Sequence, residues 1–320
     1  MLSGVSIGAV SALKGLLGRK EDRLLQSARV ETRDLVYLDE KNGLMRVSRT
    51  EYLRSVLPAL FDRASADPER LHRLITECRR AGFLRECLVP STRLYQIDSN
   101  HERATVVLGT ALIENDLPQE AERIFDAYLA EWGASGAVLT QLATVHAARG
   151  FITECEETLW KALTADPNYD EALRWWGAIH MEKGGEDAFL RSVEMAAALP
   201  GSWRPHLLLA KSQLEKGNIG RAMAVYRTVL ERRNNNTSPA VKLISGDLRE
   251  NGFMSEMVKL LLPIYDIHAH GPEAGWNLAQ ACVQSGYKKT AGLLLDSLDR
   301  LRRPELRPQV ERLRSLVEQM

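Results

Sequence analysis

The sequence predicts an all-α fold, a superhelical solenoid of antiparallel helix pairs, from two regularities that run through most of the chain. The first is a turn position that recurs at intervals close to 34 residues. A helix commonly ends in a residue of left-handed conformation, which glycine adopts without strain, and six of the seven turn positions are glycine. These positions are Gly82, Asp116, Gly150, Gly184, Gly217, Gly252 and Gly286.

The second regularity is a small or slender residue five positions after each turn, which lets the second helix of a pair approach the first. In the fourth unit the equivalent residue, Ala188, comes one position early. The other members of this series are Cys87, Ala121, Cys155, Ala222, Met257 and Ala291. A larger apolar residue follows four positions later in most units, at Phe125, Leu159, Tyr226, Leu261 and Leu295.

These positions divide the chain into seven repeats of one helix pair each, within a predicted helical repeat domain over residues 49–320. A repeat array escapes the size limit of a single core because each unit packs on its neighbours. The predicted repeats are residues 68–101, 102–135, 136–169, 170–202, 203–236, 237–271 and 272–305.

Both ends of the array have their own expected helices. Leu53, Leu57 and Phe61 form a helical stripe before the first repeat, and we expect Pro58 to kink that helix. Residues 306–320 carry an apolar stripe and are predicted to be a C-terminal capping helix, since a stack of repeats leaves its last apolar face open.

The N-terminal segment, residues 1–48, has a different character. Two short β-prone runs flank Asn42 and Gly43, a dipeptide suited to a tight hairpin turn, so we predict a β-hairpin over residues 33–48. Residues 1–20 are apolar but rich in glycine, and two interpretations stay open: a lipid- or partner-docking amphipathic helix, or a terminal tail. The first positive charge is Lys14, so we expect mature chain rather than a secretory signal.

Composition excludes several classes of protein. Lys plus Arg equals Asp plus Glu, 42 each, whereas a dedicated nucleic-acid binder normally carries a basic excess. The four cysteines lie far apart and form no CxxC pair, which argues against a disulfide framework and favours a reducing, cytoplasmic compartment. No apolar run is long enough to span a bilayer, so membrane contact is expected only through residues 1–20.

No motif for catalysis, phosphate binding or metal binding stands out, and we expect neither enzyme activity nor a cofactor. The cysteines and His146 and His180 fall at repeat positions that pack, so we interpret them as structural. His268 and His270 form a close pair that could contribute two metal ligands, but we expect a solvated loop before Pro272. The sequons around Asn235 and Asn236 are interpreted as a polar loop.

The spacing of these residues is similar to the tetratricopeptide signature, W-x2-L-G-x2-Y…A-x3-F…P over 34 residues. One unit has Leu108, Gly109 and Leu112, followed by Ala121 and Phe125. Another unit has Leu139, Leu142, Ala143 and His146, then Cys155, Leu159 and Pro167. The chain therefore resembles tetratricopeptide repeat proteins over residues 68–305, with departures such as Ser91 in the aromatic position of the first repeat.

The resemblance implies a concave groove lined by the first helix of each repeat. Transferred by register, the expected groove residues are Arg73, Arg103, Gln141, Thr144, Arg174, Trp175, Arg204, Lys211, Lys242, Arg249, Trp276, Asn277 and Gln280. Tryptophan and arginine are frequent hot-spot residues of interfaces, so a basic groove with two tryptophans suits a peptide with acidic and apolar anchors.

We therefore interpret the chain as a non-enzymatic scaffold or adaptor that binds a peptide or helical segment of a protein partner and brings together parts of a multiprotein assembly. One alternative is a membrane-associated assembly factor, peripheral at the cytoplasmic membrane face and anchored by residues 1–20. A further alternative is an RNA-binding helical repeat protein, against which the neutral charge counts.

Overall fold

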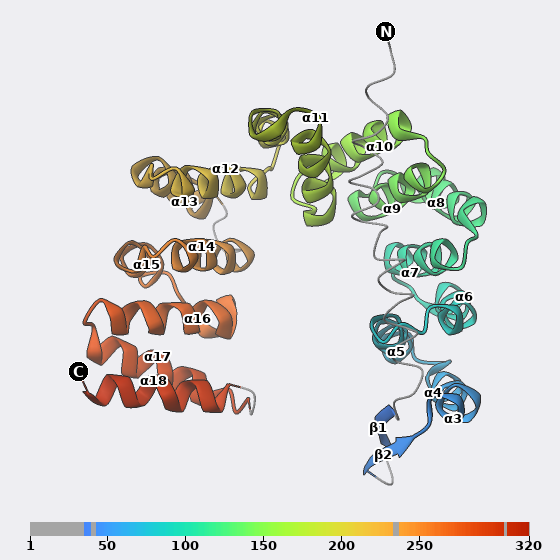
Figure 1. Ribbon diagram of the computed structural model, residues 1–320, viewed down its shortest axis with the longest axis horizontal. Coiled ribbons are helices and arrows are strands. Elements are labelled where there is room, and N and C mark those ends of the chain that lie inside the picture. The colour runs from blue at the N-terminus through green and yellow to red at the C-terminus, as the bar shows by residue number, and fades with distance from the viewer. Residues whose placement is uncertain (1–34, 40–42, 233–236, 304–305, 320) are drawn as a thin grey trace. The chain divides into compact units, whose positions relative to one another are not determined.

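The computed structural model describes residues 35–39, 43–232, 237–303 and 306–319 (Figure 1). The interpretations given above for residues 1–20, for Asn42 and for Asn235 and Asn236 lie outside the described residues. The chain divides into two compact units, Met1–Ser192 and Val193–Met320, which are described separately.

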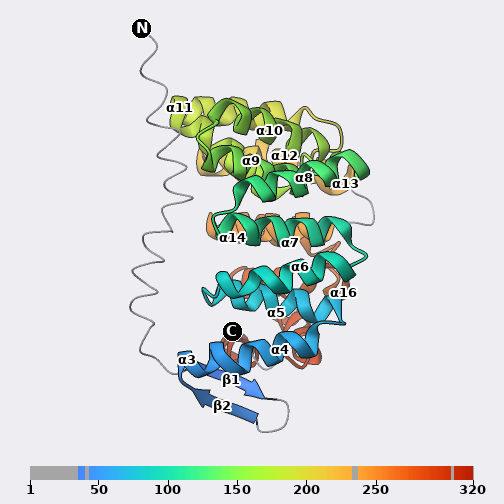
Figure 2. The same cartoon turned by 90° about the vertical axis from the view of Figure 1, so that its right-hand side faces the viewer.

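The first unit contains the predicted hairpin. Strand β1 (Leu35–Asp39) pairs antiparallel with β2 (Gly43–Val47), from Leu35 opposite Val47 to Asp39 opposite Gly43. Gly43 has a φ of 74°, a conformation that glycine adopts readily, so it suits the end of the turn. In Figures 1 and 2 the hairpin lies beside the first helices of the unit.

The helix that follows is interrupted just before Pro58. It begins as α3 (Arg49–Glu51), widens into a π-helical turn over Tyr52–Val56, and continues as α4 (Leu57–Ala64). Proline has no N–H to donate to the carbonyl one turn back, and its ring crowds that carbonyl. The wide turn, in which the N–H of Leu57 donates to the Tyr52 carbonyl, is the local adjustment at the place where the sequence predicts a kink.

Antiparallel helix pairs make up the rest of the first unit. Each first helix packs against its own second helix, α7 packs against α9, and α8 packs against α9. The pairs are α5 (Pro68–Arg80) with α6 (Leu88–Ile97), α7 (His101–Glu114) with α8 (Pro118–Trp132), and α9 (Gly136–Ala148) with α10 (Ile152–Ala165). A short 3-10 turn, Arg85–Cys87, precedes α6. Helix α11 (Asp170–Ala197) is itself a bent pair that breaks at Gly184 and Gly185, and it continues into the second unit.

The second unit repeats this arrangement and ends in the predicted cap. Its pairs are α12 (Arg204–Glu215) with α13 (Ile219–Arg232), α14 (Ser238–Glu250) with α15 (Met254–Leu261), and α16 (Ile267–Gln284) with α17 (Lys288–Arg300). Helix α18 (Arg307–Gln319) packs on α17 and buries Val310, Leu313 and Val317. The all-α prediction of stacked helix pairs, with a hairpin and a cap, is confirmed within the units.

The turn positions behave as predicted in six of the seven repeats. Five glycines have φ between 78° and 83°, and Asp116 has a φ of 62°. The fourth repeat differs, because Gly184 has a φ of −158° and its neighbour Gly185, at 65°, is the left-handed residue. The assignment of Ala188 to the small-residue position is also wrong, because Phe189 occupies that position. Ser192, Val193 and Ala196, which follow Phe189 by three, four and seven residues, are the buried residues of the second helix of this repeat. Gly177, which lies against the Phe189 ring, makes room for the larger side chain.

Small and large residues complement each other across a helix pair. A Cβ atom on Gly109 of α7 would lie 2.1 Å from the Phe125 ring of α8, so the ring occupies the space that the glycine leaves. The first repeat reverses the sizes, with Ile75 on the first helix and Ser91 on the second, both buried. This reversal accounts for Ser91 in the position where the tetratricopeptide signature has an aromatic residue.

Candidate functional site

The candidate site consists of the sides of the first helices on which the predicted groove residues lie. We call the side formed by α5, α7, α9 and residues 170–183 the N-terminal face, and the side formed by α12, α14 and α16 the C-terminal face. Within the second unit α14 packs against both α12 and α16, so the C-terminal face is continuous from helix to helix.

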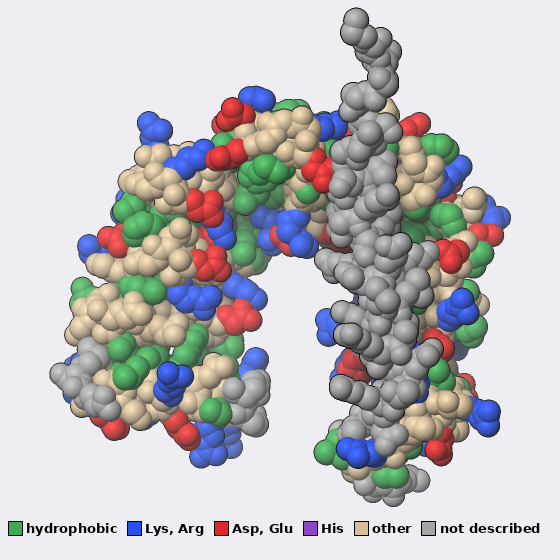
Figure 3. All heavy atoms as spheres, viewed as in Figure 1, with side chains coloured by type: hydrophobic (Ala, Val, Ile, Leu, Met, Phe, Trp, Pro, Cys, Tyr) green, Lys and Arg blue, Asp and Glu red, His purple; other side chains and the backbone are tan. Residues whose placement is uncertain are grey.

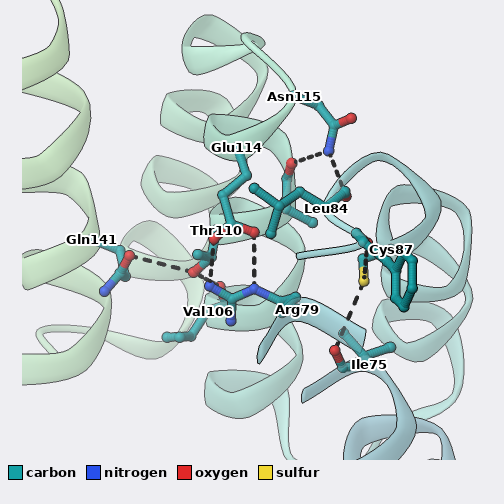
Figure 4. A network of polar contacts seen from close by, with 11 residues as sticks. Ile75, Arg79, Leu84, Cys87, Val106, Thr110, Glu114, Asn115 and Gln141 are labelled. Carbon is teal, nitrogen blue, oxygen red and sulfur yellow. Dashed lines mark hydrogen bonds and ion pairs between the residues drawn. The ribbon is translucent and has the colours of Figure 1, made fainter. Parts of the chain in front are cut away.

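Polar contacts connect successive helices of the N-terminal face (Figure 4). Arg79 of α5 donates from Nε and Nη2 to the two carboxylate oxygens of Glu114 on α7, at 2.9 Å each. Thr110 of α7 donates to Oε1 of Gln141 on α9, at 3.3 Å. Gln141 is only 8% exposed, and the hydroxyl of Thr144 donates back to the Thr140 carbonyl. Gln141 and Thr144 are therefore already engaged within the protein.

Arg103 is also engaged, at the start of α7. Its Nε and Nη2 atoms donate to both oxygens of Asp98, at 2.8 and 3.0 Å, and its Nη1 lies 2.6 Å from Glu69 of α5. Burial raises the pKa of Asp98, but the hydrogen bonds from Arg103 and the Asn100 amide outweigh it and leave that pKa below its ordinary value. Arg103 thus ties two repeats together.

Three other predicted residues of the N-terminal face differ in accessibility. Arg73 is exposed and forms no ion pair with a described residue. The Arg174 side chain is 71% exposed and pairs with Asp170, one turn earlier on its own helix, at 3.0 Å. Trp175 is 7% exposed, and its buried indole N–H has no acceptor among the described residues. Arg73 and Arg174 are the accessible cations of this set.

On the C-terminal face, two predicted lysines are neutralised by carboxylates of the next repeat. Lys211 of α12 lies 3.4 Å from Asp247 and 3.0 Å from Glu250, both on α14. Burial raises the pKa of Asp247 above its ordinary value, although the Lys211 charge and a hydrogen bond from Tyr226 oppose the shift. Lys242 of α14 pairs with Glu273 of α16.

Arg249 has a different partner. Its Nη1 donates to Oδ1 of Asn277 on α16 at 3.0 Å, and Nδ2 of Asn277 donates to the hydroxyl of Ser245 at 3.0 Å. Trp276 and Gln280 lie beside Asn277 on the same helix and are half-buried. At the start of α12, Arg204 is half-buried, and its guanidinium lies 5.2 Å from the centre of the Trp203 ring.

The structure therefore uses many of the predicted basic residues to connect repeats. Figure 3 shows basic and acidic side chains beside one another on the visible surface of the second unit. The acidic partners Glu114, Asp247 and Glu250 were missed as site residues by reasoning from the sequence. The sequence did contain a signal for these pairs, which is the separation between opposite charges. Arg79 and Glu114 are 35 residues apart and Lys211 and Glu250 are 39 apart, close to the length of one repeat.

The chain is similar to several solved structures at low sequence identity. No protein-family model matches the chain, and a search of curated proteins finds no matching relative. Among solved structures, a tetratricopeptide repeat protein from Parabacteroides merdae is similar at 13% identity and a TM-score of 0.35, over 78% of this chain and 98% of its own. Yeast Tom70 is similar at 14% identity and a TM-score of 0.46, over 84% of this chain and 58% of its own. YrrB, described as a tetratricopeptide protein with an unusual peptide-binding site, is similar at 16% identity and a TM-score of 0.32, over 55% of this chain and 92% of its own.

The fold is tetratricopeptide-like. Helix pairs with left-handed residues about one repeat apart, and the Gly109–Phe125 contact between the two helices of a pair, are the observations that carry this statement. Among the described helices of this tetratricopeptide-like chain, none is both long enough and apolar enough to cross a membrane.

The side chains with potential chemistry pack into this tetratricopeptide-like core. All four cysteines are free and buried, and burial raises the pKa of the Cys155 thiol to about 12. His146 lies 3.2 Å from the Thr158 hydroxyl, and His180 packs edge-on against Trp176. Within the described part of the chain, no group of three or more Cys, His, Asp or Glu side chains could hold a metal ion.

The prediction of a solvated loop at His268 and His270 is wrong in part. The two histidines lie in a single helical turn that the non-helical Gly271, with a φ of 78°, separates from the rest of α16. Asp266 caps this turn and accepts hydrogen bonds from the N–H groups of His268 and Ala269. His270 is buried: the Asp266 amide donates to its Nδ1 at 2.9 Å, and its Nε2 lies 2.7 Å from the Thr237 hydroxyl. Both ring nitrogens therefore have partners within the protein.

Proposed function

We propose that this chain is a non-enzymatic protein–protein interaction scaffold that holds a peptide or helical segment of a partner on its first-helix faces. The observation that carries the proposal is a set of exposed or half-buried side chains on those faces that no described carboxylate of a neighbouring helix neutralises. The set consists of Arg73, Arg249, Trp276 and Gln280, together with Arg174, whose ion pair with Asp170 joins two exposed groups one turn apart. Pairs of this kind contribute only about 0.3–0.5 kcal/mol, so a partner's carboxylate can compete for Arg174.

Tryptophan and arginine supply much of the binding energy in protein interfaces, because they combine a large contact area with directional hydrogen bonds. A stack of helix pairs also offers an extended surface rather than a closed pocket, which suits a peptide or a helix better than a small molecule. The four unpaired cysteines support a reducing compartment such as the cytoplasm for this interaction.

Affinity capture with mass spectrometry, using the full chain as bait, tests the proposal. We expect a defined partner whose recovery falls strongly for Arg174→Glu and for Trp276→Ala, with helix content measured by circular dichroism unchanged. Trp132→Ala is a matched control, because Trp132 is a 53% exposed tryptophan on the second helix α8, outside both faces. Recovery of the same partners by the wild type and both face variants would refute the proposal.

A further inference from the structure

The three cations that extend from α12 and α14 across the C-terminal face differ in what neutralises them. Lys211 lies against two carboxylates, and Lys242 lies against one. Among the described residues, the exposed Arg249 side chain bonds only to the side-chain amide of Asn277, which carries no charge. Among these three, Arg249 therefore keeps a full positive charge that no described carboxylate neutralises.

A buried chain of hydrogen bonds positions this guanidinium. Asn277 is 6% exposed, and its Nδ2 donates to the hydroxyl of the fully buried Ser245, which donates in turn to the Lys242 carbonyl at 2.9 Å. The amide oxygen of Asn277 is thus held toward Arg249. The guanidinium is held through one Nη atom, so its remaining N–H groups stay available to bind a carboxylate. Because the Arg249 side chain is already ordered, binding costs less conformational entropy than it would for a free side chain.

The residues around Arg249 are suited to a peptide. Gln280 follows Trp276 by four residues and Asn277 by three on α16, so its side chain neighbours each of the other two. Trp276 is half-buried and offers an aromatic surface, while Gln280 offers both a hydrogen-bond donor and an acceptor. Neighbouring positions of α16 therefore offer an apolar contact at Trp276 and a polar contact at Gln280, next to the Asn277 side chain that holds the Arg249 charge.

We propose that Arg249 binds one acidic side chain, Asp or Glu, of a peptide segment on the C-terminal face, with an apolar neighbour of that residue on Trp276. The proposal rests on the proposed scaffold function and names the chemistry of its partner. Lys211 and Lys242 are already paired with carboxylates of the protein, so among these three cations only the Arg249 charge is available to a peptide. We therefore expect the peptide to contribute a single acidic residue.

The test uses the full-length protein and a positional-scanning library of synthetic peptides with acetylated and amidated ends, in which one position at a time is held constant. We expect the wild type to select Asp or Glu at one position and an apolar residue next to it. Arg249→Gln should remove the acidic preference and weaken binding of the selected acidic peptide roughly tenfold, the scale of one charged hydrogen-bonded contact. Arg249→Glu should convert the preference to Lys or Arg.

A second variant separates a binding role from a folding role. Asn277→Asp gives Arg249 a carboxylate partner but removes the N–H that donates to Ser245, so it should abolish the acidic preference at some cost in melting temperature, with helix content near that of the wild type. Arg227→Gln is the matched control, because Arg227 is exposed on the second helix α13, and it should select the same peptides as the wild type.

The outcomes distinguish the inference from the function on which it rests. If the wild type selects no residue type at any position, the scaffold proposal fails, and the inference fails with it. Selection without an acidic preference, or an acidic preference that survives Arg249→Gln, overturns the inference alone.

Discussion

At the scale of single residues, the contact between Gly109 and Phe125 makes the sharpest prediction about stability. Phe125 is fully buried, and a Cβ atom on Gly109 would meet its ring at 2.1 Å. Gly109→Ala should therefore lower the free energy of unfolding by about 2 kcal/mol, since overpacking forces the ring or the helices to move. Urea unfolding followed by circular dichroism measures this loss.

The same substitution has an internal control and a rescue. Gly292→Ala places a Cβ in open space within α17 and should be neutral or slightly stabilising. Phe125→Leu in the Gly109→Ala background should cost less than the sum of the two single substitutions, because the smaller side chain frees space for the new methyl group. Strict additivity would mean that the two residues do not compete for one volume.

A second prediction at this scale concerns Asp98 and Arg103, which we expect to contribute to stability. Asp98→Asn should lower the free energy of unfolding by about 2 kcal/mol at neutral pH, because it removes the carboxylate that holds the Arg103 guanidinium. Since the pKa of folded Asp98 lies below its ordinary value of 3.8, the stabilisation is complete above that pH and is lost as pH falls through the lowered pKa.

Urea unfolding across this pH range tests the assignment. The difference between wild type and Asp98→Asn should shrink below pH 3.8, whereas Asp187→Asn, at an exposed position, should match the wild type throughout. If the difference in unfolding free energy between wild type and Asp98→Asn stays constant at acid pH, the effect of the substitution does not depend on the charge of Asp98.

Residues that pack were predictable from the sequence, and residues that pair were much less so. The small residues Ala121 and Cys155 are buried as expected, because apolar spacing along a helix reports burial directly. The partners of Lys211 and Arg249 depend on the offset between neighbouring helices and on the rotamers of long side chains. Those are properties of contacts between repeats, and the spacing within one helix does not encode them.

At the scale of elements, the turns between paired helices make a prediction with two opposite signs. Gly217 has a φ of 78°, and Gly220, three residues later, lies in the ordinary helix α13; neither has another atom within 4 Å of an added Cβ. Gly217→Ala should cost about 1 kcal/mol of stability through backbone strain. Gly220→Ala should be stabilising by up to about 1 kcal/mol through helix propensity.

Thermal unfolding of the two variants measures both effects in one background. The two substitutions are chemically identical and close in sequence. If both shift the melting temperature in the same direction, helix propensity alone decides their effect on stability. The turn prediction was accurate where one glycine follows the helix, as at Gly217. It was one residue off at Gly184 and Gly185, since two adjacent glycines can each supply the left-handed conformation.

At the scale of the whole molecule, the cap α18 should be needed for solubility. Removing residues 306–320 exposes the surface of α17 that Val310, Leu313 and Val317 now cover. Burying three such side chains contributes roughly 5 kcal/mol by transfer free energies, so the truncated chain should be less stable and should self-associate. Light scattering with size-exclusion chromatography measures the association.

Leu316→Lys is the comparison for this truncation, because Leu316 is 46% exposed and its replacement leaves the covered surface intact. That variant should remain monodisperse to the same degree as the wild type. If the truncated chain matches the wild type in light scattering and in size-exclusion chromatography, the last repeat does not need α18 to cover its apolar surface.

The matching of small and large residues across a helix pair also constrains how such a chain changes over generations. If a duplication copied α7 without α8, the copied Gly109 would pack against a helix that has no Phe125 ring, and a cavity would remain at that contact. A copy of α8 alone would press Phe125 onto a first helix with no gap to receive it. Whole pairs can be gained, lost or exchanged with their internal fit preserved, so the pair is the heritable building block of this array.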